Sequence, residues 1–434
     1  MKSEKKKELF KEFLANNQIL VVDKSSASRR RLTKTLVDLG SKRNQVHSVS
    51  HYSEAVDIIE KEKPKLVLSD YAINGGSGFD LFTDYRQIHP DEKKSTLILI
   101  TSNISQSAVA KAAEEDVDSF IIKPYTVKSL EKSLINAVIN KLYPSEYVKT
   151  VDAGKEQMFA GDYATAMATF ESAILLDKKP SLAHFYHGQC KYFLDLNEEA
   201  EGDYEKGLMI NNIHFKCQIG LFDIFKKEGK HKEAYDVVRN IAKYFPSNPD
   251  RLKEVIRLCM ITKNYKDMEM YYDIFVDLDE RTDDVINFIC SGLYIYGKHA
   301  LIEGDTAKTK EIFDKVGISC AGVSKFLKSM IALLVENGIY LDAQKLLSRF
   351  SMGGDNKEDY EVCAFLADSN SMANTERISK GLDLFNKGYK HPYATKILIN
   401  SLFQQGNEKK ASEYLEEAEH LWPDDFKSFV KAAA

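Results

Sequence analysis

The sequence predicts a multi-domain chain: a doubly wound α/β domain with a five-stranded parallel sheet, followed by an all-α domain of helical repeats. Two observations predict this division. Apolar runs of strand length alternate with helical patterns in residues 17–142, whereas residues 146–434 carry helix pairs that recur every 34 residues. The chain has 434 residues, enough for roughly two to four domains with substantial cores.

The α/β domain is predicted from five strand-and-helix units. In chain order they are Ile19–Val22 with Arg30–Leu39, Val46–Val49 with Glu54–Ile59, Leu66–Leu68 with Phe79–Arg86, Leu97–Ile100 with Ala108–Ala113, and Phe120–Ile122 with Leu130–Leu142. Strands that are buried on both faces read as continuous apolar runs, and crossover helices join parallel strands. The alternation therefore indicates a parallel sheet with helices on both faces.

A short helical extension is predicted before the first strand, over residues 1–16. It contains Lys5, Lys6 and Lys7, while Leu9, Phe10 and Leu14 fall on one side of a helix. Such a segment either caps the α/β domain or frays as a tail.

Chemistry-bearing side chains stand at the ends of the predicted strands. Asp23 follows the first strand, Asp70 the third, Thr101 the fourth and Lys123 the fifth. Ligands of doubly wound folds bind beyond the carboxyl ends of the strands, so these side chains are expected to share one site.

The segments ILVVDKS, LVLSDYAINGGSG, LILITS and SFIIKPYT carry these residues at spacings that resemble the receiver domain of two-component response regulators, a flavodoxin-like fold. The resemblance implies that Asp70 is a phosphoacceptor that takes a phosphoryl group from a phosphohistidine. It implies that Lys123, followed by a cis Pro124, clamps the phosphoryl charge and that Thr101 binds a phosphoryl oxygen. Thr101 and Phe120 would be the switch residues.

The resemblance also implies a magnesium ion held by Asp23, Asp70 and the backbone carbonyl of Ala72. The sequence departs from the family at this point, because Lys24 stands where a second acid is usual. Three placements of Lys24 are open: it points to solvent and leaves a weakened metal site, it pairs with Asp23 and Asp70 in the metal's place, or it helps to bind phosphate.

Two further features of this domain have plainer interpretations. Gly75 and Gly76, in the segment after Asp70, are expected to form a turn with positive φ values. The cluster Arg29, Arg30 and Arg31 is expected to be a solvated helix face or a kinase-docking rim rather than a nucleic-acid site.

The helical half shows a 34-residue period with one fixed point in the second helix of each pair. The fixed points are Ala166, Ala200, Ala234, Met268, Thr309, Ala343, Arg377 and Ala411. Seven extra residues precede Thr309, and an irregular spacer between Leu278 and Gly304 would explain them. Four residues later, large apolar or aromatic residues recur in all copies but the seventh, which has Gly381. Five residues before the fixed point, a glycine recurs in five copies: Gly161, Gly229, Gly304, Gly338 and Gly406.

This pattern resembles the tetratricopeptide repeat, with about eight units in residues 146–434 and with Pro246 and Pro423 at helix-ending positions. Arrays of such repeats stack into a superhelix whose concave face, lined by the first helices, binds peptides or helices of other proteins. Candidate partner-binding residues on first helices are Tyr192, Lys226 and Arg257.

Composition excludes several classes of function. The 60 Lys and Arg residues nearly balance the 65 Asp and Glu residues, which gives no electrostatic footprint for nucleic acid. The six widely spaced cysteines fit free buried thiols in a reducing cytoplasm. The charged N-terminus lacks the apolar segment of a signal peptide, and no run of 18 apolar residues predicts membrane insertion.

These features together predict a cytoplasmic response regulator and not an enzyme beyond receiver chemistry. A histidine kinase or phosphotransfer protein would phosphorylate Asp70 with Mg²⁺ as cofactor, and the repeats would bind a protein partner or a second copy of the chain. The alternative is a phosphorylation-independent scaffold in which Asp23, Lys24, Asp70 and Lys123 form a frozen charge cluster. The short segment around Pro144 and Ser145 predicts coupling between the two domains.

Overall fold

The computed structural model describes residues 3–90, 94–102, 117–244, 248–278, 281–320, 323–350 and 356–423. The chain divides into two compact units, residues 1–251 and 252–434, and the division passes through the first turn of helix α13. The α/β domain and the first three helix pairs therefore belong to one unit, and the later pairs to the other.

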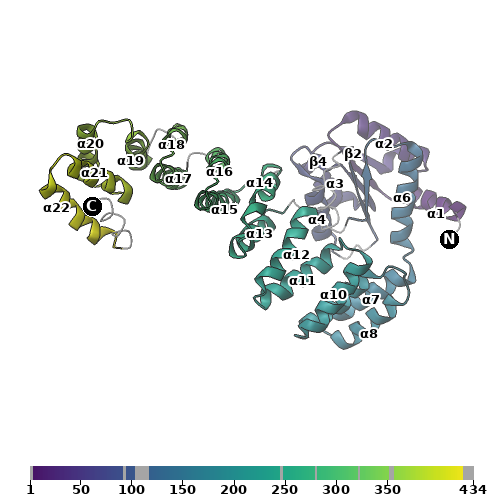
Figure 1. Ribbon diagram of the computed structural model, residues 1–434. Coiled ribbons are helices and arrows are strands. Elements are labelled where there is room, and N and C mark those ends of the chain that lie inside the picture. Colours follow the sequence, from purple (N-terminus) through teal and green to yellow (C-terminus); the bar gives the residue numbers. More distant parts are fainter. Residues whose placement is uncertain are drawn as a thin grey trace. The chain divides into compact units, whose positions relative to one another are not determined.

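The α/β domain contains the predicted parallel sheet (Figure 1). Its strands are β1 (Ile19–Val22), β2 (Val46–Val49), β3 (Leu66–Ser69), β6 (Thr96–Thr101) and β7 (Ser119–Ile122), in the order β2-β1-β3-β6-β7. All neighbours pair in parallel, with Val22 beside Ser69 and Thr101 beside Ile122. This is the flavodoxin-like order, so the predicted fold class of this domain is confirmed.

Helices cover both faces of the sheet. The described helices are α1 (Ser3–Asn16), α2 (Ser26–Asp38), η1 (Arg43–Gln45), α3 (Tyr52–Glu62), α4 (Gly78–Ile88) and α6 (Val127–Leu142). Residues of α1, α2 and α6 pack with Ile19, Val21 and Leu68 on one face, whereas residues of α3 and α4 pack with Leu20 and Val67 on the other. The alternation of strand side chains between two faces explains why each strand is apolar throughout. The predicted helix Ala108–Ala113 lies outside the described residues.

The N-terminal extension is a helix that packs on the α/β domain. Phe10 and Leu14 are buried in the same core cluster as residues of α6, and Phe13 joins them. An ion pair between Lys7 and Glu131, 2.8 Å between Nζ and Oε1, lies at the edge of this contact. Of the two alternatives for this segment, the structure shows the cap.

The helical half consists of eight consecutive helix pairs in its described residues (Figure 1). The first helices are α7 (Glu146–Phe159), α9 (Ser181–Phe193), α11 (Phe215–Lys227), α13 (Pro249–Ile261), α15 (Asp283–Ile302), α17 (Ser324–Glu336), α19 (Lys357–Asp368) and α21 (Pro392–Gln404). The second helices are α8 (Tyr163–Ile174), α10 (Asn197–Ile210), α12 (His231–Tyr244), α14 (Met268–Val276), α16 (Thr306–Ser319), α18 (Tyr340–Leu347), α20 (Asn374–Asn386) and α22 (Glu408–Leu421). These pairs resemble tetratricopeptide repeats, as the period predicts. Pro246 lies outside the described residues.

The predicted fixed points are the most deeply buried positions of the second helices. Seven of the eight are fully buried, and only Arg377, in the seventh copy, is partly exposed; its Nε donates a hydrogen bond of 2.7 Å to the carbonyl of Ser369. The large residue does not always stand four places later. In the fourth and sixth copies Tyr271 and Leu346, three places later, are buried instead, because positions three and four residues apart share one helix face.

Glycines in the first helices complete this packing, and the sequence pattern missed them. A Cβ at Gly154 would lie 2.5 Å from the ring of Phe170, and one at Gly297 would lie 2.4 Å from the ring of Phe313. In both pairs the glycine stands 16 residues before the aromatic residue. The aromatic ring of the second helix therefore occupies the space of a missing side chain on the first.

The turn glycines have the backbone conformation expected of them. Gly161, Gly229, Gly304, Gly338 and Gly406 have φ values between 69° and 84°. In the second and fourth copies, Asp195 and Lys263 occupy the equivalent position and have φ values of 61° and 60°. The turn geometry is therefore kept even where glycine is replaced.

The seven-residue insertion lengthens a helix and is not an irregular spacer. Helix α15 has 20 residues, compared with 13 in α13 and in α17. By length and composition it is the one described helix that meets the criterion for a membrane span, with 44% of its apolar window buried. Its buried residues include Leu293, and it packs along α16, which fits the core helix of a repeat.

All six cysteines are buried free thiols, as predicted. Burial raises the pKa of Cys190 to about 11 and the pKa of Cys217 and Cys363 to about 12. Such thiols stay protonated and unreactive at neutral pH.

Candidate functional site

The candidate site lies at the carboxyl edge of the parallel sheet, where four strands end close together. Asp23 follows β1, Asp70 follows β3, Thr101 ends β6 and Lys123 follows β7. The register holds these ends level, since Asp70 donates its backbone N–H to Val22 and Lys123 donates its own to Thr101. Direct contacts bring Asp23, Asp70 and Lys123 together at this edge.

Lys123 joins the two carboxylates. Its Nζ donates hydrogen bonds of 2.7 Å to Oδ2 of Asp23 and of 2.7 Å to Oδ2 of Asp70. Asp23 is 1% exposed and Asp70 is 8% exposed, so the cluster is largely shielded from water. Burial lowers the pKa of Lys123, but the hydrogen bonds to Asp23 and Asp70 outweigh burial and raise the pKa above its usual value. The ammonium is therefore fixed in its charged form between two acids.

The carboxylate of Asp23 is held by the start of α2. Its Oδ1 accepts a hydrogen bond from the backbone N–H of Ser25 at 2.8 Å, and its Oδ2 accepts one from the hydroxyl of Ser28 at 2.6 Å. Arg29 donates to the carbonyl oxygen of Asp23 at 2.6 Å. Sequence reasoning missed Ser28 and Arg29 as part of the site. The signal was the N-cap spacing, because the Ser25 side chain accepts from the backbone N–H of Ser28 and so begins α2 directly after Asp23.

Lys24 points to solvent and does not lie between the two carboxylates. Its side chain is exposed, and it forms no ion pair with any residue in the described part of the chain. The predicted alternative, in which Lys24 pairs with Asp23 and Asp70, is not found. Lys123 occupies the position between the two carboxylates.

The segment after Asp70 forms a small antiparallel hairpin of β4 (Ala72–Ile73) and β5 (Gly76–Ser77). Of the two glycines predicted to have positive φ, Gly75 has a φ of 86°, whereas Gly76 is in β5. Gly78, at the start of α4, approaches the backbone so closely that a Cβ there would lie 2.3 Å from the carbonyl oxygen of Asp70. The sequence reasoning did not single out Gly78, which fixes the distance between α4 and the candidate phosphoacceptor.

The hairpin is tied to the start of α3. Tyr52 donates its backbone N–H to the carbonyl of Asn74, and the Tyr52 hydroxyl donates a hydrogen bond of 2.6 Å to Asp84. Burial, followed by the bond to Asp84, raises the pKa of Tyr52 far above its usual value. Ala72, whose backbone carbonyl is the expected magnesium ligand, is therefore part of a structured hairpin.

The two candidate switch residues lie on neighbouring strands. Thr101 is buried at the end of β6. Phe120, on β7, is partly buried and packs against the core cluster that contains Phe79 and Leu99. The two strands pair in parallel, with Thr101 opposite Ile122 and Leu99 opposite Phe120.

Two of the three clustered arginines have structural partners. Arg29 binds the carbonyl of Asp23, as described above. Arg31 donates to the carbonyl of Tyr125 at 2.9 Å and lies 5.3 Å from the centroid of the Tyr125 ring. Tyr125 follows the Lys123-Pro124 peptide bond, which is cis as predicted. Arg30 and Arg31 are exposed, as expected of a solvated helix face, whereas Arg29 is partly buried against Asp23.

The oxygen ligands of this edge fit a hard cation, although with less negative charge than two adjacent acids would provide. Asp23 and Asp70 both direct an oxygen at one cationic group, which is the Lys123 ammonium. Magnesium is held by one or two carboxylates and keeps several waters. Asp23 and Asp70 are therefore the side chains that would hold Mg²⁺, and the resemblance to receivers adds the backbone carbonyl of Ala72.

The family comparison agrees with this geometry. Residues 19–135 match the family described as "Response regulator receiver domain". The Vibrio cholerae protein "Chemotaxis protein CheY-3" is 30% identical over 121 residues, which cover 27% of this chain and 89% of that protein. The chain belongs to the response-regulator receiver family. The "Chemotaxis protein CheY homolog" of Campylobacter jejuni is 31% identical over 121 residues and is covered to 88%, so the receiver relatives match the first part of the chain only.

The helical half has a structural match of lower similarity. A solved tetratricopeptide repeat protein from Parabacteroides merdae covers 58% of this chain and 97% of its own length, with 12% identity and a TM-score of 0.30. The assignment of the repeats therefore depends on the eight helix pairs and on their buried fixed points.

The three candidate partner-binding residues lie on first helices, as predicted, and each of them already contacts a neighbouring side chain. Tyr192 is partly buried, and the Lys227 ammonium lies 5.2 Å from its ring centroid. Arg257 forms two hydrogen bonds of 2.9 Å with the Glu254 carboxylate on its own helix. Lys226 is exposed, with its ammonium 5.7 Å from the Phe222 ring centroid. These placements make Lys226 the most accessible of the three.

Proposed function

We propose that the protein is a response regulator of a two-component phosphorelay in which Asp70 accepts a phosphoryl group and the repeats bind another protein. The observation that carries the proposal is the contact of Lys123 with both Asp23 and Asp70 at 2.7 Å, at the end of four parallel strands. A carboxylate nucleophile with a fixed cation beside it is what acyl-phosphate chemistry needs.

In the proposed transfer, an oxygen of Asp70 attacks the phosphorus of a phosphohistidine. The new O–P bond forms as the N–P bond breaks, and the electron pair of that bond returns to the imidazole of the donor. Oδ1 of Asp70 accepts the backbone N–H of Tyr71 at 2.7 Å, which orients the carboxylate. Lys123 stays beside Oδ2 and neutralises charge on the phosphoryl oxygens, and the Thr101 hydroxyl would bind one of them. Magnesium, when bound by Asp23, Asp70 and Ala72, would supply further charge neutralisation.

The output proposed for the repeats is protein binding, through the faces that the first helices present. The donor would be a histidine kinase or a phosphotransfer protein, and the partner a protein, a peptide or a second copy of the chain. Such a pathway operates in the cytoplasm. No DNA-binding output is proposed, since the residues described after the receiver form helix pairs of one repeated type.

One experiment separates this function from its alternative, a scaffold that works without phosphorylation. The purified protein is incubated with acetyl phosphate, with and without Mg²⁺, and the phosphoryl adduct is measured by intact mass, with Asp70→Asn as control. We expect a magnesium-dependent adduct on the wild type only. Because Lys123 already satisfies both carboxylates and Lys24 adds no acid, the alternative predicts no adduct under any condition. That outcome would make the receiver a docking surface.

The proposal includes coupling between the receiver and the repeats. Helix α6 ends at Leu142 and α7 begins at Glu146, so only three residues separate the two regions. We expect beryllofluoride to change hydrogen exchange in α7 and α8 of the wild type and not of Asp70→Asn. Identical exchange in the repeats with and without beryllofluoride would contradict coupling while leaving phosphorylation itself intact.

A further inference from the structure

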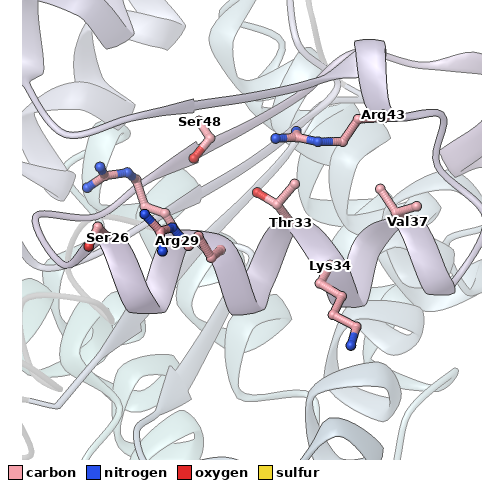
Figure 2. Close-up of a pocket in the computed structure, with 8 residues that line it drawn as sticks. Ser26, Arg29, Thr33, Lys34, Val37, Arg43 and Ser48 are labelled. Carbon is pink, nitrogen blue, oxygen red and sulfur yellow. The ribbon is translucent and has the colours of Figure 1, made fainter.

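A second site, which is positively charged, lies on the receiver between α2 and the segment that leads from η1 into β2. It is a cavity of about 500 Å³. Figure 2 shows Thr33 on α2 facing Ser48 and Arg43 across this cavity. The polar residues that line it are four cations and three hydroxyl groups: Arg29, Arg30, Lys34, Arg43, Ser26, Thr33 and Ser48. No acidic side chain is part of the lining.

Among the residues that the structure describes, no ion pair neutralises the four cations of this cavity. Arg30 and Lys34 are exposed, and neither forms an ion pair with a residue that the structure describes. Arg29 and Arg43 donate to backbone carbonyls, which carry no formal charge. The one acid of α2 is Asp38, at its last residue. The acid at the positive amino end of α2, Asp23, is already paired with Lys123, so Arg29 and Arg30 add positive charge that an anion in the cavity would offset.

The hydroxyl of Thr33 is a second, independent sign of a ligand. Thr33 is 6% exposed, and its Oγ1 has no hydrogen-bond partner in the described structure. Thr35 on the same helix bonds to the carbonyl of Arg31 at 3.0 Å, the usual solution for a helical threonine. A buried hydroxyl without a partner is destabilising, so the orphaned donor at the cavity wall is best explained by an acceptor from a ligand.

We propose that this cavity binds a small molecule carrying two or more linked phosphate groups. Guanidinium groups match phosphate oxygens in fork geometry, and hydroxyl donors from Thr33 and Ser48 complete a set that prefers phosphate to an apolar ligand. Four cations exceed what one phosphate requires, which favours an oligophosphate. The volume lies within the range of small-molecule sites. Asp70 and Lys123 do not line the cavity, so binding there does not require a phosphoryl group on Asp70.

The site also has a physical link to the phosphorylation site. Arg29 lines the cavity and binds the carbonyl of Asp23, whose carboxylate contacts Lys123. A phosphate that draws the Arg29 guanidinium into the cavity would weaken its bond to Asp23. Occupancy of the cavity would thereby change how firmly Asp23 is held.

The proposal is tested by calorimetric titration of the full chain with pyrophosphate, ATP, inorganic phosphate and sulfate, in the absence of magnesium. We expect saturable binding of pyrophosphate and ATP, and binding at least tenfold weaker for inorganic phosphate and sulfate. The variant Arg30→Gln/Lys34→Gln should weaken pyrophosphate binding at least tenfold, and Thr33→Val several-fold. Asp70→Asn should bind as the wild type does.

The matched control is Lys128→Gln/Lys132→Gln, which removes two charges four residues apart from the exposed surface of α6. It should change the affinity for pyrophosphate less than twofold. The proposal is overturned if neither pyrophosphate nor ATP binds saturably at millimolar concentration, or if the control weakens binding as much as Arg30→Gln/Lys34→Gln. Tighter binding by Asp70→Asn than by the wild type would place the anion at Lys123, because the substitution frees that ammonium from one carboxylate. Equal affinity for sulfate and pyrophosphate would indicate a single-anion site. Either result would contradict an oligophosphate site at α2.

Discussion

The receiver and the helical repeats both contain buried charge, but they assemble it over very different lengths of chain. In the receiver, Lys123 contacts Asp23 and Asp70, which lie 100 and 53 residues away. In the repeats, the buried Asp203 binds His187, 16 residues away on the partner helix of the same pair, at 2.7 Å. Burial opposes the ionised form of Asp203, yet hydrogen bonds from His187 and Lys191 lower its pKa far below the usual range. A doubly wound sheet gathers distant residues, whereas a repeat satisfies its charges locally.

The same contrast holds for apolar packing. The receiver core has two clusters, one on each face of the sheet, and each takes residues from at least three strands. The first repeat has a core cluster made from α7, α8 and α9 alone. Repeat arrays of this kind have stabilities that are approximately sums over neighbouring units. Damage is therefore expected to spread through the receiver and to stay local in the repeats.

The largest expected effect comes from a matched pair of core truncations. Leu68→Ala in β3 and Leu398→Ala in α21 each remove a side chain that is 1% exposed, and each should lower stability by about 3 kcal/mol. Hydrogen exchange resolved by peptide should show lost protection across β1, β3 and β6 for Leu68→Ala. For Leu398→Ala the loss should be confined to α20, α21, α22 and adjacent helices. Equal loss in α15 and α16 would show that the repeats unfold as one unit.

A smaller effect is expected from removing one cation from each region. Lys123→Met leaves Asp23 and Asp70 facing each other without a counter-charge. Because the cluster is largely buried, we expect the free energy of unfolding of the receiver to fall by about 2 kcal/mol. Lys380→Met breaks the pair with Glu376, whose side chains are 52% and 47% exposed, and should cost no more than about 0.5 kcal/mol. The measurement is the same exchange experiment on the two regions. Similar losses of stability in Lys123→Met and Lys380→Met would contradict the expected difference between the buried charge cluster and the surface ion pair.

The smallest effect is a dependence of the repeats on pH. Burial, and then the charge of Lys328, lowers the pKa of His391 to about 4, with Asp359 acting in the opposite direction. Because the folded pKa lies below the unfolded value of about 6.5, this histidine's contribution is complete above pH 6.5 and is lost as the pH falls towards 4. We expect α21 to lose about 1–2 kcal/mol of local stability between pH 7 and pH 5.

His391→Asn should remove this pH dependence, since asparagine does not titrate and is a favourable N-cap residue at the start of α21. The control is His231→Asn at an exposed position on α12, which should leave the pH dependence of α21 unchanged. If His391→Asn and the wild type lose protection in α21 equally at pH 5, the buried imidazole is not the cause.

The sequence by itself determined the local patterns. Strand-length apolar runs predicted five strand-and-helix units, and the described residues contain four of them in full. The 34-residue period located eight second helices and five turns with positive φ. These are properties of neighbouring residues, so they can be read without knowledge of what packs against them. The resemblance to receivers also assigned Asp70 and Lys123 before their contact was visible.

Only the tertiary structure decided which side chains fill the shared space at the strand ends. It placed Lys123, and not Lys24, between Asp23 and Asp70, because the end of β7 lies beside β6 while Lys24 projects to solvent. It also brought Arg43 and Ser48 opposite Thr33 to form a cavity that no spacing along the chain predicts. The physical reason is the same in each case. Contacts between residues far apart in sequence depend on how strands and helices pack. A periodic pattern does not tell which of these residues come close together in space.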